Sequence, residues 1–224
     1  MPEADRLHDR VLSALNPEHG AELPARWQQR KSALTRQKII DAAVDCLVTC
    51  GYAGLTTAAV AQRCAISRGT MSHHFATRMD LVQTVVESVF YEQMRGFLNA
   101  YRTTLAAAGE DFLVEIATEK HWRSVQSREY AAYIALALAA RTDAELAPCF
   151  TAAARRYDDV WSSEMRGAFP QWQRHWDALQ LANDFTIAAH MGLLINGPVL
   201  GDGARMARVR DLIVKVVAEL YAGP

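Results

Sequence analysis

Residues 55–75 read LTTAAVAQRCAISRGTMSHHF, and this stretch decides the fold that we expect for the N-terminal part of the chain. It predicts two short helices, over about 57–64 and about 68–75, separated by a short break. Thr56 and Ser67 stand immediately before these helices, where a hydroxyl oxygen can accept hydrogen bonds from free backbone N–H groups. Two short helices joined by a tight turn form a candidate helix-turn-helix.

The side chains of this stretch suit a close pair of helices with one outward-facing surface. Val60 and Ala61 face inward from the first predicted helix, and Ile66 fills the turn. Gly69 and Thr70 keep the start of the second helix slim enough to enter a DNA major groove, which is about 12 Å wide. The outward side chains that can reach base edges or phosphates are Arg68, Thr70, Ser72 and His73.

Helical patterns continue on both sides of this motif. Apolar residues at helical spacing predict a helix over residues 27–50, which Gly51 ends. A second long helix is predicted from about residue 77 to about residue 107. The rest of the chain favours four or five more helices, because no segment shows the sustained alternation and β-branched composition of strands. We therefore expect an all-α protein.

Charge is distributed unevenly among three predicted segments of the chain. Residues 26–80, the helix-turn-helix domain, hold eight Lys or Arg and three acidic residues, a balance of +5. The N-terminal extension (1–25) and the helical body (81–224) each sum to -3, which gives the total of -1. A basic module on an acidic body is the distribution expected if only that module meets phosphate.

The motif resembles the helix-turn-helix of the TetR family of transcriptional regulators. The matching residues are Ile39-Ile40-Asp41-Ala42-Ala43, Gly51-Tyr52, Ser67-x-Gly69-Thr70, His74-Phe75 and Arg78-x-x-Leu81. The resemblance covers about residues 34–85. It implies an N-terminal three-helix DNA-binding domain and a C-terminal helical bundle that binds ligand and dimerises. It further implies a cytoplasmic homodimer that binds double-stranded operator DNA. Such a regulator is most often a repressor that a small-molecule effector releases from DNA, and an activator is the alternative.

The resemblance also implies which residues meet DNA, with two departures from the family pattern. The implied DNA-binding residues are Thr56, Thr57, Arg68, Gly69, Thr70, Ser72, His73 and Arg78. Ser72 stands where the family usually has an aromatic residue, and Ala65 replaces the turn glycine, which predicts a strained or altered turn. Arg78 is implied as a phosphate contact at a helix start, with a solvated surface arginine as the alternative.

For the body, the resemblance implies a ligand pocket and a dimer interface through the last two helices. Aromatic and isolated polar residues on otherwise apolar helices are the candidate ligand contacts, and they suit an apolar or aromatic effector. These candidates are His121, Trp122, Tyr133, Trp161, Met165, His190 and Asn196. The candidate interface residues are Phe185, Ala188, Met191, Ile195, Ile213, Val217 and Leu220. For both sets, ordinary core or surface positions remain the alternative.

Other classes of function find little support in the sequence. The longest apolar run, residues 131–140, is about half the roughly 20 residues that a membrane span needs. An enzyme would have to use lone acids and bases such as His121, His190, Asp184 or Glu119, without a nucleophile or phosphate-loop motif.

Metal and cofactor sites are not expected either. His73 and His74 are adjacent, and neighbouring helical residues point about 100° apart, so we expect no metal between them. The four cysteines form no CxxC pair and are expected as reduced core thiols. We expect no cofactor.

Overall fold

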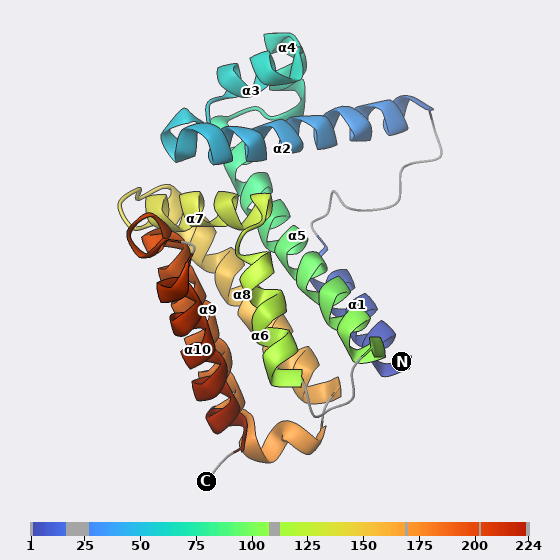
Figure 1. Cartoon of the computed structure of the whole chain (residues 1–224). Helices are drawn as coiled ribbons and strands as arrows, with labels where there is room; N and C mark the ends of the chain where they lie inside the picture. The colour runs from blue at the N-terminus through green and yellow to red at the C-terminus, as the bar shows by residue number, and fades with distance from the viewer. Residues whose placement is uncertain (1, 17–26, 108–112, 169, 202, 223–224) are drawn as a thin grey trace. The chain divides into compact units, whose positions relative to one another are not determined.

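The computed structural model describes residues 2–16, 27–107, 113–168, 170–201 and 203–222, and all regular elements in these ranges are helices (Figure 1). The elements are α1 (Pro2–Leu15), α2 (Trp27–Gly54), α3 (Thr57–Cys64), α4 (Arg68–His74), α5 (Arg78–Ala107), α6 (Leu113–Ser124), α7 (Arg128–Ala140), α8 (Leu146–Ala168), the short η2 (Pro170–His175), α9 (Trp176–Leu200) and α10 (Ala204–Ala222). The predicted all-α class is confirmed.

The chain forms two compact units, which we describe separately. The helix-turn-helix unit comprises residues 12–94 and 128–160, and the C-terminal unit comprises residues 1–11, 95–127 and 161–224. This division differs from the three segments expected from the sequence. The first part of α5, all of α7 and most of α8 share a unit with the helix-turn-helix, because their apolar residues join its core.

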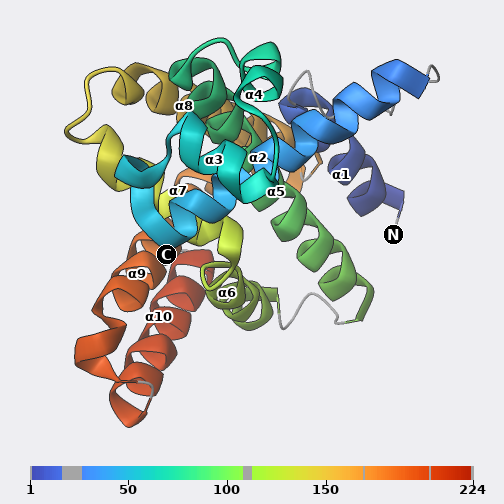
Figure 2. The same ribbon diagram turned by 90° about the horizontal axis from the view of Figure 1, so that it is seen from above.

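The core of the helix-turn-helix unit forms around α2. Ile39, Ala43 and Leu47 are buried there together with Leu81 and Val85 of α5. α3 packs against α2 and α4 against α3, and Figure 2 shows both short helices over α2. α7 packs along α2 away from them (Figure 1). The two short helices are therefore held on a continuous apolar base.

The predicted end of the first long helix at Gly51 corresponds to a sharp kink. Gly51 has φ +66° and ψ -174°, and a last turn of helix follows to Gly54. Glycine adopts this left-handed φ without a Cβ clash, so it can redirect the chain toward α3.

The core of the C-terminal unit lies where α6, α9 and α10 pack together. α9 and α10 lie side by side in both views (Figures 1 and 2). Ala182 and Leu193 of α9 are buried with Ile213 and Val217 of α10. None of the helices in the described ranges is long and apolar enough to cross a membrane.

The N-terminal extension forms more regular structure than the sequence indicated. α1 is a 14-residue amphipathic helix that buries Leu7, Val11 and Leu15 at helical spacing. Residues 17–25 of the predicted extension lie outside the described residues.

Candidate functional site

Both short helices of the helix-turn-helix begin with the caps that the sequence predicts. The Thr56 hydroxyl accepts a hydrogen bond from the backbone N–H of Ala59 at 3.1 Å. The Ser67 hydroxyl accepts one from the backbone N–H of Thr70 at 3.0 Å. Each cap satisfies a backbone donor that the first turn leaves free, so it fixes where the helix starts. The predicted caps are confirmed.

The turn between the two helices contains a non-glycine residue in the left-handed region. Ala65 has φ 55° and ψ 45°, the only positive φ outside glycine in the described residues. Its N–H donates to the Gln62 carbonyl at 3.1 Å, and the Ile66 N–H donates to the Ala61 carbonyl at 3.0 Å. This pair of bonds closes the end of α3 in the manner of a Schellman motif. The strain expected at Ala65 is therefore present.

α4 presents a polar face on one side and one buried anchor on the other. Arg68, Ser72 and His73 are exposed, whereas Met71 is buried. Gly69 is also exposed, and a Cβ at its position would meet only the Ser67 hydroxyl, at an ordinary 3.7 Å. Thus the fold leaves the surface of α4 free for recognition.

Thr56, Thr57 and Thr70 are less available for contacts outside the protein than the exposed residues of α4, because they are half-buried or hydrogen-bonded within the motif. Thr57 and Thr70 are half-buried, and Thr56 is exposed but holds its cap. The hydroxyls of Ser67 and Thr70 lie 2.9 Å apart, within hydrogen-bond distance. Thr70 therefore helps to shape the start of α4, and a base contact from it stays a prediction.

Arg78 lies inside the unit, and this corrects the picture of a free cation at a helix start. Its Nε donates to the Leu55 carbonyl at 2.8 Å, its Nη1 to the Tyr52 hydroxyl at 3.1 Å, and its Nη2 to the Tyr52 carbonyl at 3.2 Å. The guanidinium also lies over the Tyr52 ring, 4.4 Å from its centre. Arg78 therefore ties the end of α2 to the start of α3 and α5, and a phosphate contact from it stays a prediction.

Arg36 is a positioning residue that sequence reasoning missed. Its Nη1 donates to the His74 carbonyl at 3.0 Å, and its Nη2 donates to the Thr84 hydroxyl at 3.2 Å. The guanidinium lies 4.3 Å from the centre of the Phe75 ring. Burial lowers the pKa of Arg36, while the Glu87 carboxylate raises it. Arg36 holds the C-terminal end of α4 against α5, but its partners lie 38 and 48 residues away, so no local pattern marks it.

The two histidines that end α4 differ in exposure. His73 is exposed, and its ring meets that of His74 edge to face, with ring centres 5.4 Å apart. His74 is half-buried, and its pKa is lowered by burial and by the neighbouring His73 and Arg36. These positions agree with an outward His73 and an inward His74.

The seven predicted ligand contacts lie in both units and do not line one cavity, and ligand binding by them stays a prediction. Tyr133 belongs to the helix-turn-helix unit, where its ring packs against Phe90 and Phe150. Asn196 is exposed and donates to the Gly192 carbonyl of its own helix at 2.8 Å. The Tyr133 side chain therefore packs in the other unit, and the Asn196 side chain bonds to its own helix.

Three of the seven do meet in the C-terminal unit. His121 and His190 stack with ring centres 5.1 Å apart and Nδ1 atoms 2.8 Å apart, and the Trp122 ring lies edge-on to His190. One Nδ1 must carry the hydrogen and the other must accept it, so the two rings are complementary neutral tautomers. Burial lowers the pKa of both imidazoles. His190 also lines a cavity of about 530 Å³ together with Thr118 and Arg210.

Trp161 and Met165, the remaining two, lie near the end of α8. The Trp161 ring packs edge to face on Phe97, with ring centres 4.9 Å apart, and Met165 is buried. Neither lines the cavity beside His190.

The predicted interface residues differ in their exposure within the chain, and their role in a dimer stays a prediction. Ile213 and Val217 are buried in the core of their own unit, with Phe185 and Leu220 packed against them. Met191 is half-buried. Ala188 and Ile195 are exposed, as an interface in the free chain requires.

Exposed apolar residues that the sequence analysis did not select lie on the same two helices. They are Leu181 and Val199 on α9 and Val209, Leu212 and Tyr221 on α10. With Ile195, whose relative exposure is 54%, and without Tyr221, which lies about half a turn around α10 from Leu212, we call these residues the α9–α10 apolar face. An exposed cluster of large apolar side chains marks an interaction surface more often than isolated ones do.

Comparison with known proteins identifies the N-terminal motif. The sequence model of the bacterial regulatory proteins of the tetR family matches residues 39–85. Residues 39–85 are thus similar to the helix-turn-helix of TetR-family regulators. The HTH-type transcriptional regulator CymR of Pseudomonas putida is 39% identical over 69 residues, which are 31% of this chain and 34% of CymR. The match thus spans about a third of that relative.

Solved structures extend the likeness of fold over most of the chain. A transcriptional regulator from Pseudomonas aeruginosa PAO1 aligns with a TM-score of 0.60 at 16% identity, covering 90% of this chain and 97% of that one. The multidrug binding protein EbrR, complexed with imidazole, aligns with a TM-score of 0.55 at 20% identity, covering 81% and 93%. The TetR-type module is therefore part of a fold that these regulators share.

Proposed function

We propose that this chain is a DNA-binding transcriptional regulator whose helix α4 enters the major groove of its operator. The exposed polar face of α4, held by the Ser67 cap and by the Arg36 contacts, is the observation that carries the proposal. The +5 balance of residues 26–80 supports it, because phosphate contacts dominate the affinity of such modules. A regulator of this kind works in the cytoplasm.

We infer further that the chain acts as a homodimer through the α9–α10 apolar face. Burying Ile195, Val199 and Leu212 against a second copy would remove large apolar side chains from water. A two-fold dimer presents two α4 helices about one DNA turn apart, roughly 34–36 Å, and so reads a palindromic operator.

The proposed regulator is a repressor that a small apolar or aromatic effector releases. The cavity beside His190, with the Trp122 ring edge-on to that histidine, supports effector binding in the C-terminal unit. The capture of imidazole by EbrR shows that a protein of this fold takes up small molecules. An effector that binds more tightly to a conformation in which the two α4 helices of the dimer are spaced differently would weaken DNA binding. The size of the effect equals the difference in its affinity for the two conformations.

Binding to DNA taken from beside the gene itself tests the proposal. Fluorescence anisotropy at two salt concentrations, with random DNA as competitor, is expected to show specific and steeply salt-dependent binding. His73→Ala, at an exposed position of α4, should change sequence preference, with a discrimination loss of about 1–3 kcal/mol for a lost base contact. Arg155→Ala, exposed on α8, is the matched control. Equal affinity for operator and random DNA would contradict the proposal.

A further inference from the structure

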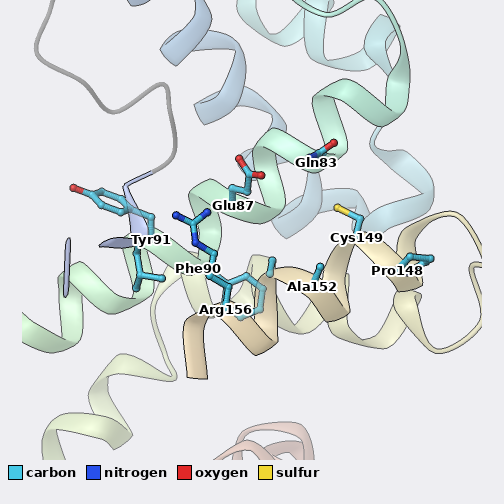
Figure 3. Close-up of a pocket in the computed structure, with 10 residues that line it drawn as sticks. Gln83, Glu87, Phe90, Tyr91, Pro148, Cys149, Ala152 and Arg156 are labelled. Atoms are coloured by element: carbon cyan, nitrogen blue, oxygen red, sulfur yellow. The ribbon is translucent and has the colours of Figure 1, made fainter. Parts of the chain in front are cut away.

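The helix-turn-helix unit contains a cavity of about 390 Å³ that no predicted residue lines. Two helices supply most of its wall at helical spacing, with Gln83, Glu87 and Tyr91 on α5 and Cys149, Ala152 and Arg156 on α8 (Figure 3). The other lining residues are Leu15, Phe90, Pro148 and Ala153. A mostly apolar wall with a few polar groups, at this volume, is typical of a site for a small organic molecule.

Glu87 is the acidic residue among the described residues that line this cavity, and its charge acts on Arg36 at longer range. Its side chain is half-buried, and within the described part of the chain its carboxylate makes no hydrogen bond or ion pair. Arg156, on the facing helix, donates from Nη2 to the Ala14 carbonyl at 2.7 Å. A partly desolvated carboxylate gains from a charged donor, because such a bond is about twice as strong as a neutral one.

The end of α1 forms part of the cavity wall. Leu15 is buried beside the cavity, and the bond from Arg156 to Ala14 fastens this end of the helix. α1 lies outside residues 39–85, so this wall is an addition to the TetR-family segment. The N-terminal extension thereby acquires a role that its sequence did not indicate.

A second, polar cavity of about 650 Å³ shares Gln83, Glu87 and Arg156 with the first. It reaches the C-terminal end of α4, where Ser72, His73, His74, Phe75 and Ala76 line it, and Arg36 lines it too. Arg36 donates a hydrogen bond to the His74 carbonyl and interacts electrostatically with Glu87. A cation bound at Glu87 would therefore lie close to the arginine that holds the end of α4.

We propose that the first cavity binds a small amphipathic amine, with its apolar body between Leu15 and Phe90 and its ammonium group on the Glu87 carboxylate. An alcohol of the same shape keeps the apolar contacts but loses the charge-assisted bond, and a carboxylate is repelled by Glu87. The effect of such an amine on operator binding rests on the proposed function, but the amine site itself does not.

Three probes with the same apolar body test the site on the full chain without DNA. Phenylbutylamine, phenylbutanol and 5-phenylpentanoate share the phenylbutyl group and differ only in the terminal group, and isothermal titration calorimetry measures each. The amine is expected to bind about tenfold more tightly than the alcohol, and the carboxylate least tightly. Glu87→Gln should remove this preference, whereas Glu145→Gln, exposed in the same unit, should keep it.

A cavity-filling variant separates binding in this cavity from binding elsewhere. Ala152→Phe places a ring in the cavity and should weaken all three probes at least tenfold, with thermal melting as the check of folding. Amine preference that survives Glu87→Gln, or binding that survives Ala152→Phe, would overturn the proposal. Operator binding is measured without any probe, so its result does not depend on the amine site. If the chain binds the amine but no operator, only the proposed regulator function is contradicted.

Discussion

Helix α4 and the helix pair α9–α10 both expose long faces, but the side chains on those faces differ in kind. α4 exposes Arg68, Ser72 and His73, which can donate hydrogen bonds to bases or phosphates. α9 and α10 expose large apolar side chains such as Ile195 and Leu212, with relative exposures of 54% and 57%. The polar face of α4 suits the major groove of DNA, and the apolar residues of α9 and α10 suit another apolar helix surface.

The supports behind the two faces differ as well. Two arginines, Arg36 and Arg78, hold the helix-turn-helix by donating to backbone carbonyls and to hydroxyls. In the C-terminal unit a neutral pair, His121 and His190, joins α6 to α9. The histidine pair therefore makes the C-terminal unit sensitive to protonation, although Arg210 and Glu119 also form an ion pair in that unit.

The largest expected effect comes from removing the arginine bridge of the helix-turn-helix. Arg78→Ala leaves the Leu55 carbonyl without its arginine donor, removes one of two donors to the Tyr52 carbonyl, and should lower the free energy of unfolding by about 3 kcal/mol. Urea unfolding measures this loss. Arg68→Ala, exposed on α4, should leave stability unchanged and weaken only DNA binding. Full stability of Arg78→Ala with a flatter salt dependence of DNA binding would instead identify Arg78 as a phosphate contact.

A charge on the α9–α10 apolar face should weaken the dimer by at least about 2 kcal/mol. Ile195→Asp would bury an unpaired carboxylate in the proposed interface. Sedimentation velocity across a concentration series measures the dissociation. Leu138→Asp, at a similarly exposed apolar position on α7, is the matched control and should keep the dimer. A dimer unaffected by Ile195→Asp would refute the assignment of this face.

The histidine pair predicts that stability falls as the pH is lowered. Burial lowers the pKa of His121 to about 4 and that of His190 further, below the ordinary value of 6.5. The unfolded chain therefore binds more protons than the folded chain below about pH 6.5, so stability present above that pH is lost toward pH 4.

We expect a loss of about 1–2 kcal/mol for each of the two histidines between pH 6.5 and about pH 5, measured by urea unfolding at each pH. His190→Gln keeps a hydrogen-bond partner for His121 and should flatten this dependence. His175→Gln, at an exposed position, is the control variant. An unchanged slope in His190→Gln would show that other groups cause the acid sensitivity.

The smallest effect concerns the turn of the helix-turn-helix. Ala65→Gly relieves the left-handed φ of 55° but gives the unfolded chain more freedom, so we expect a net gain of about 0.5 kcal/mol. For a chain of this size the gain corresponds to a rise of about 1–2 °C in melting temperature. Calorimetry measures it, and a lower melting temperature would mean that the turn is not strained.

The sequence predicted most accurately what depends on neighbours along the chain. The caps at Thr56 and Ser67 act within three residues, so their pattern could be recognised before the fold was known. The special backbone at Ala65 was expected from the resemblance to the family, because Ala65 stands in place of its turn glycine. These local features, and the all-α class, needed only the sequence.

The tertiary structure alone decided the partners of residues far apart in the chain. Arg36 and Arg78 reach acceptors 23 to 48 residues away, and the pairing of His121 with His190 spans 69 residues. Apolar residues occur on several sides of α9 and α10, so periodicity could not tell buried Ile213 from exposed Ile195. Burial is set by which helices pack against each side, and that depends on the whole fold rather than on the local pattern.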